Sequence, residues 1–437
     1  MIKKIEMGKT TLDELHQVFS ITKETLENEK ARLFPIGNTE QERPTVSIFL
    51  ASLVAVKEYR EELFLTLGVN KIRTRNVGIN IYTEIDDGNK NNRPDALVVI
   101  TSGKTTPIIE WACFIEAKIG DNILEDNQID RYCDYAKEKG INEIITISNM
   151  LVTSPLNSPI KSKKRNFKFY HWSWAYLKVM ASRLVNIDAI EDPDHKFILL
   201  ELRKYFDEHK NLKNFINMGS EWKNSVMAVQ SMDKTQKINS NILENLIISL
   251  MQEEKDISLQ LTDKTPYLVE LYAKNERINK IEEMLQNEKV LTSEYIINGN
   301  RQDNFYVEID FTRQEIRCFT KFVIKKGKAQ AQTTTLLKML ENNAGYTEKI
   351  FINAIYTRNK SIEKDTISLS SLLDEKSNGS TYYSILDKSY GDTVKYFEIK
   401  TKDLLGKRFQ GNRTFIDDLE KIVERFIEQI MTNLINK

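Results

Sequence analysis

Asp95, Glu116 and Lys118 are charged residues in segments that otherwise have the composition of buried strands. Asp95 begins the apolar run DALVVIT, and Glu116 and Lys118 stand two apart in WACFIEAKI. Because side chains two apart in a strand share one face, Glu116 and Lys118 are expected to project together. If the two strands pair as neighbours, Asp95 lies beside Glu116. The spacing therefore predicts two carboxylates and an ammonium at one point on a sheet.

Carboxylates held close together repel each other, and burial makes the repulsion more costly. A hard divalent cation such as Mg²⁺ or Mn²⁺ relieves the repulsion and can activate a water molecule. A nearby lysine can orient or deprotonate that water, or stabilise the charge that develops on a phosphate. This combination of side chains suits the hydrolysis of a phosphodiester.

The pair PD at 94–95 and the triplet EAK at 116–118 resemble the signature of the PD-(D/E)XK nuclease superfamily, the fold of many restriction enzymes and recombination nucleases. The twenty residues between them, 96–115, suit a β-hairpin. Gln128 and Tyr132, one helical turn apart, look like the Q-xxx-Y element that some branches carry on the following helix. The resemblance implies that these two residues orient the lysine of the triplet or contact the phosphate backbone.

The resemblance also implies a metal site. Asp95 and Glu116 would bind Mg²⁺ or Mn²⁺, the main-chain carbonyl of Ala117 would be a further ligand, and Lys118 would serve the attacking water. Many members carry one more acidic residue on or before the first helix. Glu42, expected just before that helix, is the first candidate, and behind it stand Glu58, Glu61 and Glu62.

The triplet E-x-K by itself is not specific in so charged a chain, because it also occurs at 221–223, 253–255 and 398–400. The first two fall in helical patterns, where residues two apart do not share a face. The third is expected in a strand, but only five residues separate it from Asp392, too few for a hairpin. We therefore expect the site at 95–118.

The elements expected around these residues follow the order helix, three strands, helix, strand, which is also the core order of the superfamily. Amphipathic spacing predicts short helices within 11–33 and one helix over 46–67 that ends near Gly68. Apolar and β-branched runs predict the strands, with a helix between the third and the fourth: 72–85, 95–101, 111–119, the helix 126–140, then 143–148 and 168–173.

With 437 residues, the chain is expected to contain more than one domain. The predicted fold class is α/β: a restriction-endonuclease-like central mixed sheet flanked by helices, followed by a helical region and a second α+β domain. The expected segments are an N-terminal helical segment, the nuclease domain, a mostly helical connecting region and the C-terminal α+β domain, at 1–44, 45–190, 191–295 and 296–437 respectively.

Charge and composition exclude several classes of protein. The 63 basic and 63 acidic residues give a net charge of zero, so any nucleic-acid site must be a local patch. The densest basic cluster is KSKKRNFK at 161–168, either a contact to a phosphate backbone or a solvated loop.

Three scattered cysteines and four scattered histidines argue against a disulfide framework and a zinc site. No signal-like or membrane-spanning apolar run is present, which predicts a cytoplasmic protein without a membrane partner.

Several aromatic and sulfur-containing residues near this region have a structural and a functional interpretation. Trp172 and Trp174 could stack on bases, but core packing is favoured. His171 is expected to be a strand histidine with satisfied hydrogen bonds. Cys113 and Cys133 are expected to fill the core.

Together these observations predict a Mg²⁺-dependent DNA endonuclease, in the setting of bacterial restriction or anti-phage defence. The sequence contains no GxxxxGK[ST] motif of the kind that binds nucleotide in motor proteins, and this favours an endonuclease over a processive enzyme. One alternative is a nuclease that acts on RNA or tRNA with the same site. Another is a non-catalytic nucleic-acid-binding subunit of a larger defence complex. The apolar face of the helix at 415–431 either packs on its own domain, which is favoured, or forms a homodimer or a larger assembly.

Overall fold

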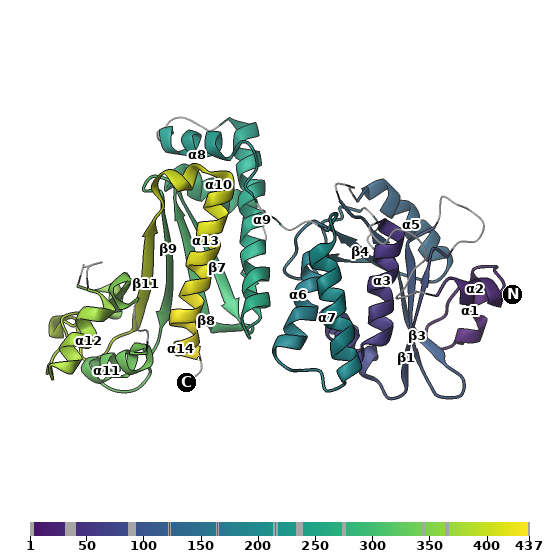
Figure 1. Ribbon diagram of the computed structural model, residues 1–437, viewed down its shortest axis with the longest axis horizontal. Coiled ribbons are helices and arrows are strands. Elements are labelled where there is room, and N and C mark those ends of the chain that lie inside the picture. Colours follow the sequence, from purple (N-terminus) through teal and green to yellow (C-terminus); the bar gives the residue numbers. More distant parts are fainter. Residues whose placement is uncertain are drawn as a thin grey trace. The chain divides into compact units, whose positions relative to one another are not determined.

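The computed structural model describes residues 4–30, 41–85, 93–120, 122, 124–162, 164, 166–212, 215, 217–232, 239–272, 277–342, 346–362 and 367–435. The chain divides into two compact units (Figure 1). Unit 1 comprises Met1–Asn214 and Thr262–Pro266, and unit 2 comprises Phe215–Leu261 and Tyr267–Lys437. The expected segments 1–44 and 45–190 thus fall in unit 1 and 296–437 in unit 2, while 191–295 is divided between them.

The described residues of unit 1 form a mixed five-stranded sheet in the order β1-β2-β3-β4-β5. β1, β2 and β3 pair antiparallel, and β4 and β5 add in parallel. Nearly every residue of β2 and β4 is buried, which is typical of strands covered on both faces. The bounds of the strands are Val77–Thr83, Ala96–Ser102, Ile108–Ala117, Glu143–Ser148 and Lys168–Ser173.

The two faces of this sheet have different covers. On one face, α5 (Asp126–Glu138) and the N-terminal helices pack through an apolar cluster that includes Phe19, Phe114 and Tyr135. On the other face, Phe49 and Phe64 pack edge-on against Trp172. The remaining helices of unit 1 are α1 (Leu15–Val18), α2 (Lys23–Asn28), α3 (Glu42–Ala55), α4 (Lys57–Thr66), α6 (Trp174–Asn186) and α7 (Pro193–Glu208).

The first long helix differs from the expectation. Instead of one helix over 46–67, the chain forms α3 and α4, because Val56 has extended dihedral angles (φ −103°, ψ 105°) and interrupts the helical hydrogen bonds. α3 also begins earlier, at Glu42. Pro44 is tolerated at its third position because the first N–H groups of a helix need no partner within the helix. The short helices expected within 11–33 are confirmed up to residue 28, and 31–33 lie outside the described residues.

Unit 2 is built on an antiparallel sheet, six-stranded in the part that the structure describes, in the order β10-β11-β9-β8-β7-β6. The segment 191–295, expected to be mostly helical, contains α7 to α10 and also the short strand β6 and most of β7. The bounds of the strands in chain order are Val269–Leu271, Val290–Ile297, Asn300–Asp310, Glu315–Phe322, Ile350–Ile355 and Tyr396–Leu404.

Helix α13 (Asn412–Phe426), near the C-terminus, packs against one face of this sheet (Figure 1). Its apolar face, continued by Ile430, is buried in the core of unit 2. The favoured expectation, that this face packs on its own domain, is therefore confirmed. The other helices are α8 (Trp222–Ser231), α9 (Ser240–Lys264), α10 (Arg277–Asn287), α11 (Ala329–Leu340), α12 (Leu369–Ser377) and α14 (Thr432–Ile435). No helix among the described residues is long and apolar enough to cross a membrane.

Candidate functional site

The register of β2 and β3 brings the expected carboxylates together. Ala96 pairs with Ile115 in the antiparallel register. Asp95, just before Ala96, therefore stands opposite Glu116, just after Ile115. Phe114 belongs to the core beneath α5, and Glu116, two residues on, continues the same face of the sheet. The α5 side of the sheet therefore carries the site.

Glu116 is the buried centre of this group. Its side chain is only 2% exposed, and Oε1 accepts hydrogen bonds from Lys118 Nζ at 2.5 Å and from Gln128 Nε2 at 2.7 Å. The second oxygen, Oε2, is buried and has no hydrogen-bond partner among the described residues. Burial raises the pKa of Glu116, and the adjacent Lys118 ammonium acts against that rise.

Asp95 is partly buried and is held by the main chain of the neighbouring strand. Its Oδ2 accepts a hydrogen bond from the amide N–H of Ala117 at 2.7 Å. Burial raises the pKa of Asp95 well above its usual range, and the charge of Glu116 adds to the rise. Ala117 itself is fully buried. Asp95 and Glu116 thus form a pair of neighbouring carboxylates whose like charges repel each other.

Lys118 lies just beyond the end of β3 and reaches back over the carboxylates. Its Nζ is 2.5 Å from Glu116 Oε1 and 3.5 Å from Glu42 Oε1. Its carbonyl oxygen accepts a hydrogen bond from Trp174 Nε1 at 2.9 Å. Burial acts to lower the pKa of Lys118, but the Glu116 carboxylate outweighs it and the pKa is raised. Lys118 is therefore an ammonium at neutral pH in this arrangement.

Glu42 is the acidic residue of the first helical region that reaches the site. It is the first residue of α3 rather than a residue before the helix, and its Oε2 is buried without a partner among the described residues. The three other candidates, all on α4, have partners elsewhere: Glu58 bonds to His195 at 2.7 Å, Glu61 pairs with Lys57 and Arg73, and Glu62 pairs with Arg183 at 3.2 Å.

Gln128 and Tyr132 lie on one face of α5 above the carboxylates, as their spacing predicts. Gln128 Nε2 donates to Tyr132 Oη at 3.0 Å as well as to Glu116. Tyr132 donates in turn to the carbonyl of Arg93 at 3.2 Å, two residues before Asp95. Burial, followed by the charge of Glu116, raises the pKa of Tyr132 to about 12, so its hydroxyl remains a donor.

The donor set fits a hard cation, because Glu116 and Glu42 each present a buried carboxylate oxygen without a hydrogen-bond donor among the described residues. Asp95, Glu116 and Glu42 do not, however, all lie within 4.8 Å of one another in the described part of the chain. The Lys118 ammonium, which contacts both glutamates, neutralises part of their charge.

The aromatic residues beside the site are structural. Trp172 and Trp174 are 0% and 2% exposed, which excludes base stacking and confirms core packing. His171 is buried, with Nδ1 at 2.8 Å from Thr146 Oγ1. Cys113 is buried, and Cys133 is buried as well, so both fill the core as expected. The contact of Trp174 with Lys118 was not foreseen, because no sequence signal indicates which carbonyl a buried indole will reach.

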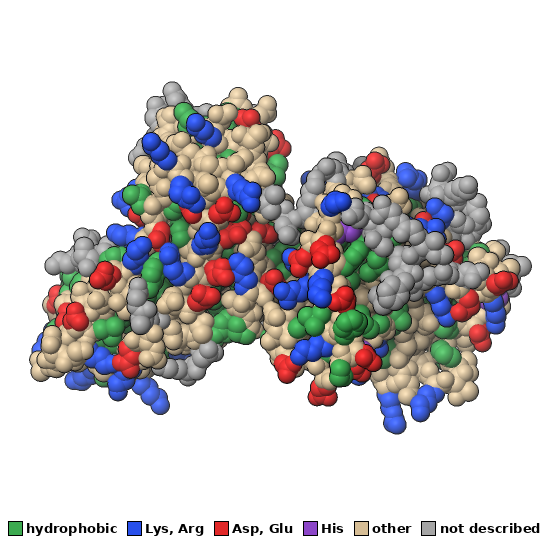
Figure 2. All heavy atoms as spheres, in the orientation of Figure 1, with side chains coloured by type: hydrophobic (Ala, Val, Ile, Leu, Met, Phe, Trp, Pro, Cys, Tyr) green, Lys and Arg blue, Asp and Glu red, His purple; other side chains and the backbone are tan. Residues whose placement is uncertain are grey.

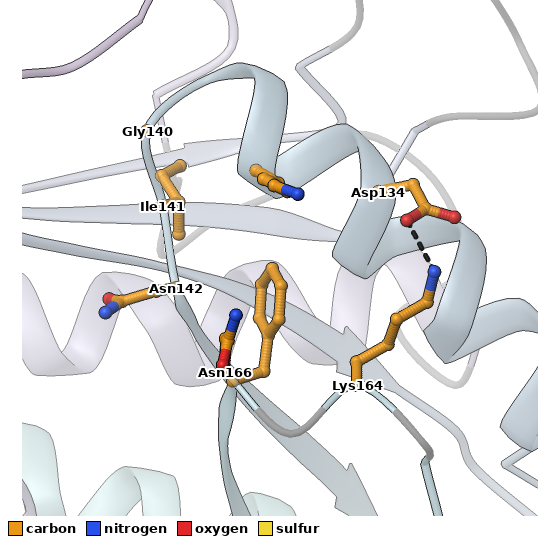
Figure 3. Close-up of a pocket in the computed structure, with 8 residues that line it drawn as sticks. Asp134, Gly140, Ile141, Asn142, Lys164 and Asn166 are labelled. Carbon is orange, nitrogen blue, oxygen red and sulfur yellow. Dashed lines mark hydrogen bonds and ion pairs between the residues drawn. The ribbon is translucent and has the colours of Figure 1, made fainter.

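The basic segment 161–168 begins beside the N-terminal part of α5, where the Lys161 amide and the Ser162 hydroxyl donate to Asp126 and Asp130. It ends at Lys168, which pairs with Glu143 at the start of β4. Asn166, Phe167 and Lys164 line a cavity of about 310 Å³ together with the C-terminal half of α5 and the segment 140–142 that precedes β4 (Figure 3). Lys164 forms an ion pair with Asp134 at 2.6 Å across it. Lys163 and Arg165 lie outside the described residues. Figure 2 shows Lys and Arg side chains interspersed with Asp and Glu over the visible face, in agreement with the net charge of zero.

Unit 1 thus gathers carboxylate oxygens suited to a cation, an ammonium suited to an anion, and an amide that holds the central carboxylate. The starts of β2 and α3, the end of β3 and one face of α5 supply them. No protein-family model, no curated protein and no solved structure matches the chain.

Proposed function

We propose that this chain is a Mg²⁺-dependent nuclease of the PD-(D/E)XK type, with its active site at Asp95, Glu116 and Lys118. The observation that carries the proposal is the contact of Lys118 and Gln128 with one oxygen of the buried Glu116, while the other oxygen has no partner among the described residues. The order of elements supports it, since an antiparallel β1-β2-β3 meander, a helix and a parallel strand are what a restriction-endonuclease-like core requires.

The carboxylates would bind the cation. Asp95 and Glu116 face each other across two strands, and Glu42 adds a third carboxylate at the start of α3. A divalent cation, Mg²⁺ or Mn²⁺, would supply Lewis acidity and would neutralise charge on the phosphate. Ala117 contributes its amide to fix Asp95, and its carbonyl is proposed as a further ligand.

Lys118 would act through its positive charge. Because its pKa is raised, the side chain keeps its proton at neutral pH and cannot serve as a base while Glu116 is unneutralised. An ammonium at this position can donate to the attacking water and to a phosphate oxygen, whose negative charge increases in the transition state. Gln128 and Tyr132 would hold Glu116 and the chain before Asp95 in place.

The test is cleavage of supercoiled plasmid and of single-stranded RNA with Mg²⁺, Mn²⁺ or EDTA. Lys118→Ala and Asp95→Ala are each expected to lower metal-dependent cleavage by roughly 10²-fold or more, the usual cost of losing a group that acts in the transition state. Lys400→Ala is a matched control, because Lys400 is also 15% exposed and lies 3.6 Å from Glu398 in another E-x-K triplet.

The outcomes separate the alternatives. We propose DNA as the substrate, in a bacterial restriction or anti-phage setting, so plasmid should be cut in preference to RNA. Preference for RNA would identify a ribonuclease that uses the same site. A wild-type protein that binds nucleic acid and never cuts it, or a Lys118→Ala protein that cuts as well as the wild type, would favour a binding subunit and would reject the assigned site.

A further inference from the structure

A second group of carboxylates lies inside unit 2, between α9 and α13. Glu253 and Asp256 are three apart on α9 and so share a face of that helix, and Glu420 comes from α13. One oxygen from each of the three lies within 4.8 Å of the others. Among the described residues, this group of acidic side chains has the spacing that could hold a metal ion.

Glu253 is the member that points to a ligand. Its side chain is only 1% exposed, and neither carboxylate oxygen has a hydrogen-bond partner within the described part of the chain. The next residue shows the contrast, because buried Glu254 is bonded by Arg277 and by Ser293 Oγ at 2.5 Å. A buried carboxylate without a donor is strongly disfavoured unless a proton or a cation neutralises it.

Gln260 holds the other two carboxylates. Its Nε2 donates to Asp256 Oδ2 at 2.6 Å and to Glu420 Oε1 at 2.7 Å. The two hydrogens of the amide nitrogen are thus both used, and neither reaches Glu253. An amide that orients two carboxylates toward a third is the kind of support that fixes ligands around an ion.

The electrostatics agree with this geometry. Burial raises the pKa of Glu253 well above its usual range, and the charges of Asp256 and Glu420 raise it further. Glu420 is only partly buried, which leaves one side of the group open to water and to an entering ion.

We propose that Glu253, Asp256 and Glu420 bind one hard divalent cation, Ca²⁺ or Mg²⁺, which joins α9 to α13. The ligands are all oxygens, without histidine or cysteine, and this selects hard cations over zinc or copper. The site is separate from Asp95 and Glu116, and the proposal does not depend on nuclease activity.

The experiment uses the full chain with Asp95→Asn, so that binding in unit 1 is weakened. Bound Mn²⁺ is counted by electron paramagnetic resonance, and Tm is recorded in EDTA, Ca²⁺ and Mg²⁺. Cation at about 100 times its Kd is expected to raise Tm by roughly 5–10 °C. Glu253→Gln added to this background should lose one bound Mn²⁺ and the rise in Tm.

Two further variants keep the result interpretable. Glu428→Gln removes an exposed carboxylate farther along the same C-terminal helical segment and should retain the bound ion and the rise in Tm. Glu420→Gln, at the partly exposed edge of the group, should reproduce the loss if Glu253→Gln does not fold. A cation response that is equal in Glu253→Gln and Glu428→Gln, or absent from all proteins, would mean that Glu253 holds a proton, and the proposal would be wrong.

Discussion

Asp95 and Glu116 stand opposite each other on neighbouring strands, in a buried part of unit 1. Their like charges therefore lower the stability of the folded protein while no cation is bound. Burial and mutual repulsion both favour protonation of Asp95, and the Ala117 amide only partly offsets them. Carboxylates with strongly raised pKa values cluster at functional sites, which agrees with the proposed function. The pair could be predicted from the sequence, because the twenty residues between Asp95 and Glu116 fit a β-hairpin. The antiparallel pairing of the two strands of a hairpin then determines which residues face each other.

Asp95→Asn is predicted to stabilise the protein in EDTA at neutral pH. The change removes a buried like charge, and we expect about 1 kcal/mol, or roughly 2–4 °C in Tm. The pKa of Asp95 is raised in the folded protein. The stability that protonated Asp95 gives the wild type is therefore fully present below the unfolded-state pKa of about 4, and it is lost as the pH rises through the folded-state pKa.

The gap in Tm between Asp95→Asn and the wild type should therefore be small near pH 4 and should widen toward neutral pH. Thermal unfolding at a series of pH values measures it. Asp13→Asn, which removes an exposed carboxylate, is the control for the loss of one negative charge. A gap that narrows with rising pH would contradict the assigned electrostatics.

Trp174→Phe is predicted to destabilise the protein more than Trp172→Phe. Both indoles are buried and both changes remove the same volume, but Trp174 Nε1 donates to the Lys118 carbonyl while Trp172 Nε1 has no partner among the described residues. The difference in unfolding free energy should be about 1–2 kcal/mol, the cost of leaving a buried carbonyl unsatisfied. Denaturant unfolding of the two variants measures this difference, and equal losses would mean that the hydrogen bond adds nothing.

At the scale of elements, periodicity located most strands and helices but not the irregular points. The break at Val56 has no glycine or proline to mark it, so α3 and α4 look like one helix in the sequence. The strand β7 was missed because Ser293 occupies an inward position that an apolar residue would normally fill. Ser293 is buried there because its hydroxyl binds Glu254, a contact that alternation of apolar residues cannot reveal.

Gly140→Ala is predicted to be far more costly than Gly68→Ala. Both glycines have φ of 79°, so each substitution carries the same left-handed strain of about 1–2 kcal/mol. A Cβ on Gly140 would lie 2.2 Å from the carbonyl oxygen of Ile5, whereas a Cβ on Gly68 would meet no described atom within 4 Å.

The clash should add roughly 2 kcal/mol or more to the cost of Gly140→Ala. It would also displace the N-terminal segment, whose Ile5 amide donates to the Lys139 carbonyl at 2.6 Å. Unfolding free energies of the two variants, compared at equal denaturant, give the answer. If Gly140→Ala and Gly68→Ala lose the same stability, the close approach of Ile5 is not maintained in solution.

At the scale of the whole molecule, each unit has a hydrophobic core of its own. One large apolar cluster of described residues lies entirely within unit 2, and the cluster around Phe114 lies within unit 1. The sequence does not predict the group at Glu253, because Glu420 is far from Glu253 and Asp256 in sequence and the triplet EEK at 253–255 falls in a helical pattern. Only the packing of α13 against α9 brings Glu420 to it.

Two cores predict two heat-absorption transitions in scanning calorimetry of the full chain. Gly140→Ala should lower the transition of unit 1, and Glu253→Gln should shift that of unit 2, since each change lies in one core only. A single transition, with equal calorimetric and van't Hoff enthalpies and moved alike by both variants, would show that the units unfold together.

The division of the chain has a consequence for its synthesis. Thr262–Pro266 belong to unit 1, although the residues before and after them belong to unit 2. When Asn214 leaves the ribosome, unit 1 still lacks a piece that is made a few seconds later, at typical rates of about 5–20 residues per second. All five strands of the sheet, which end at Ser173, are made earlier, so the sheet with its paired carboxylates can form before Asp263 arrives to accept a hydrogen bond from Asn186. A gene fragment that stops at Asn214 encodes the whole sheet without this later piece.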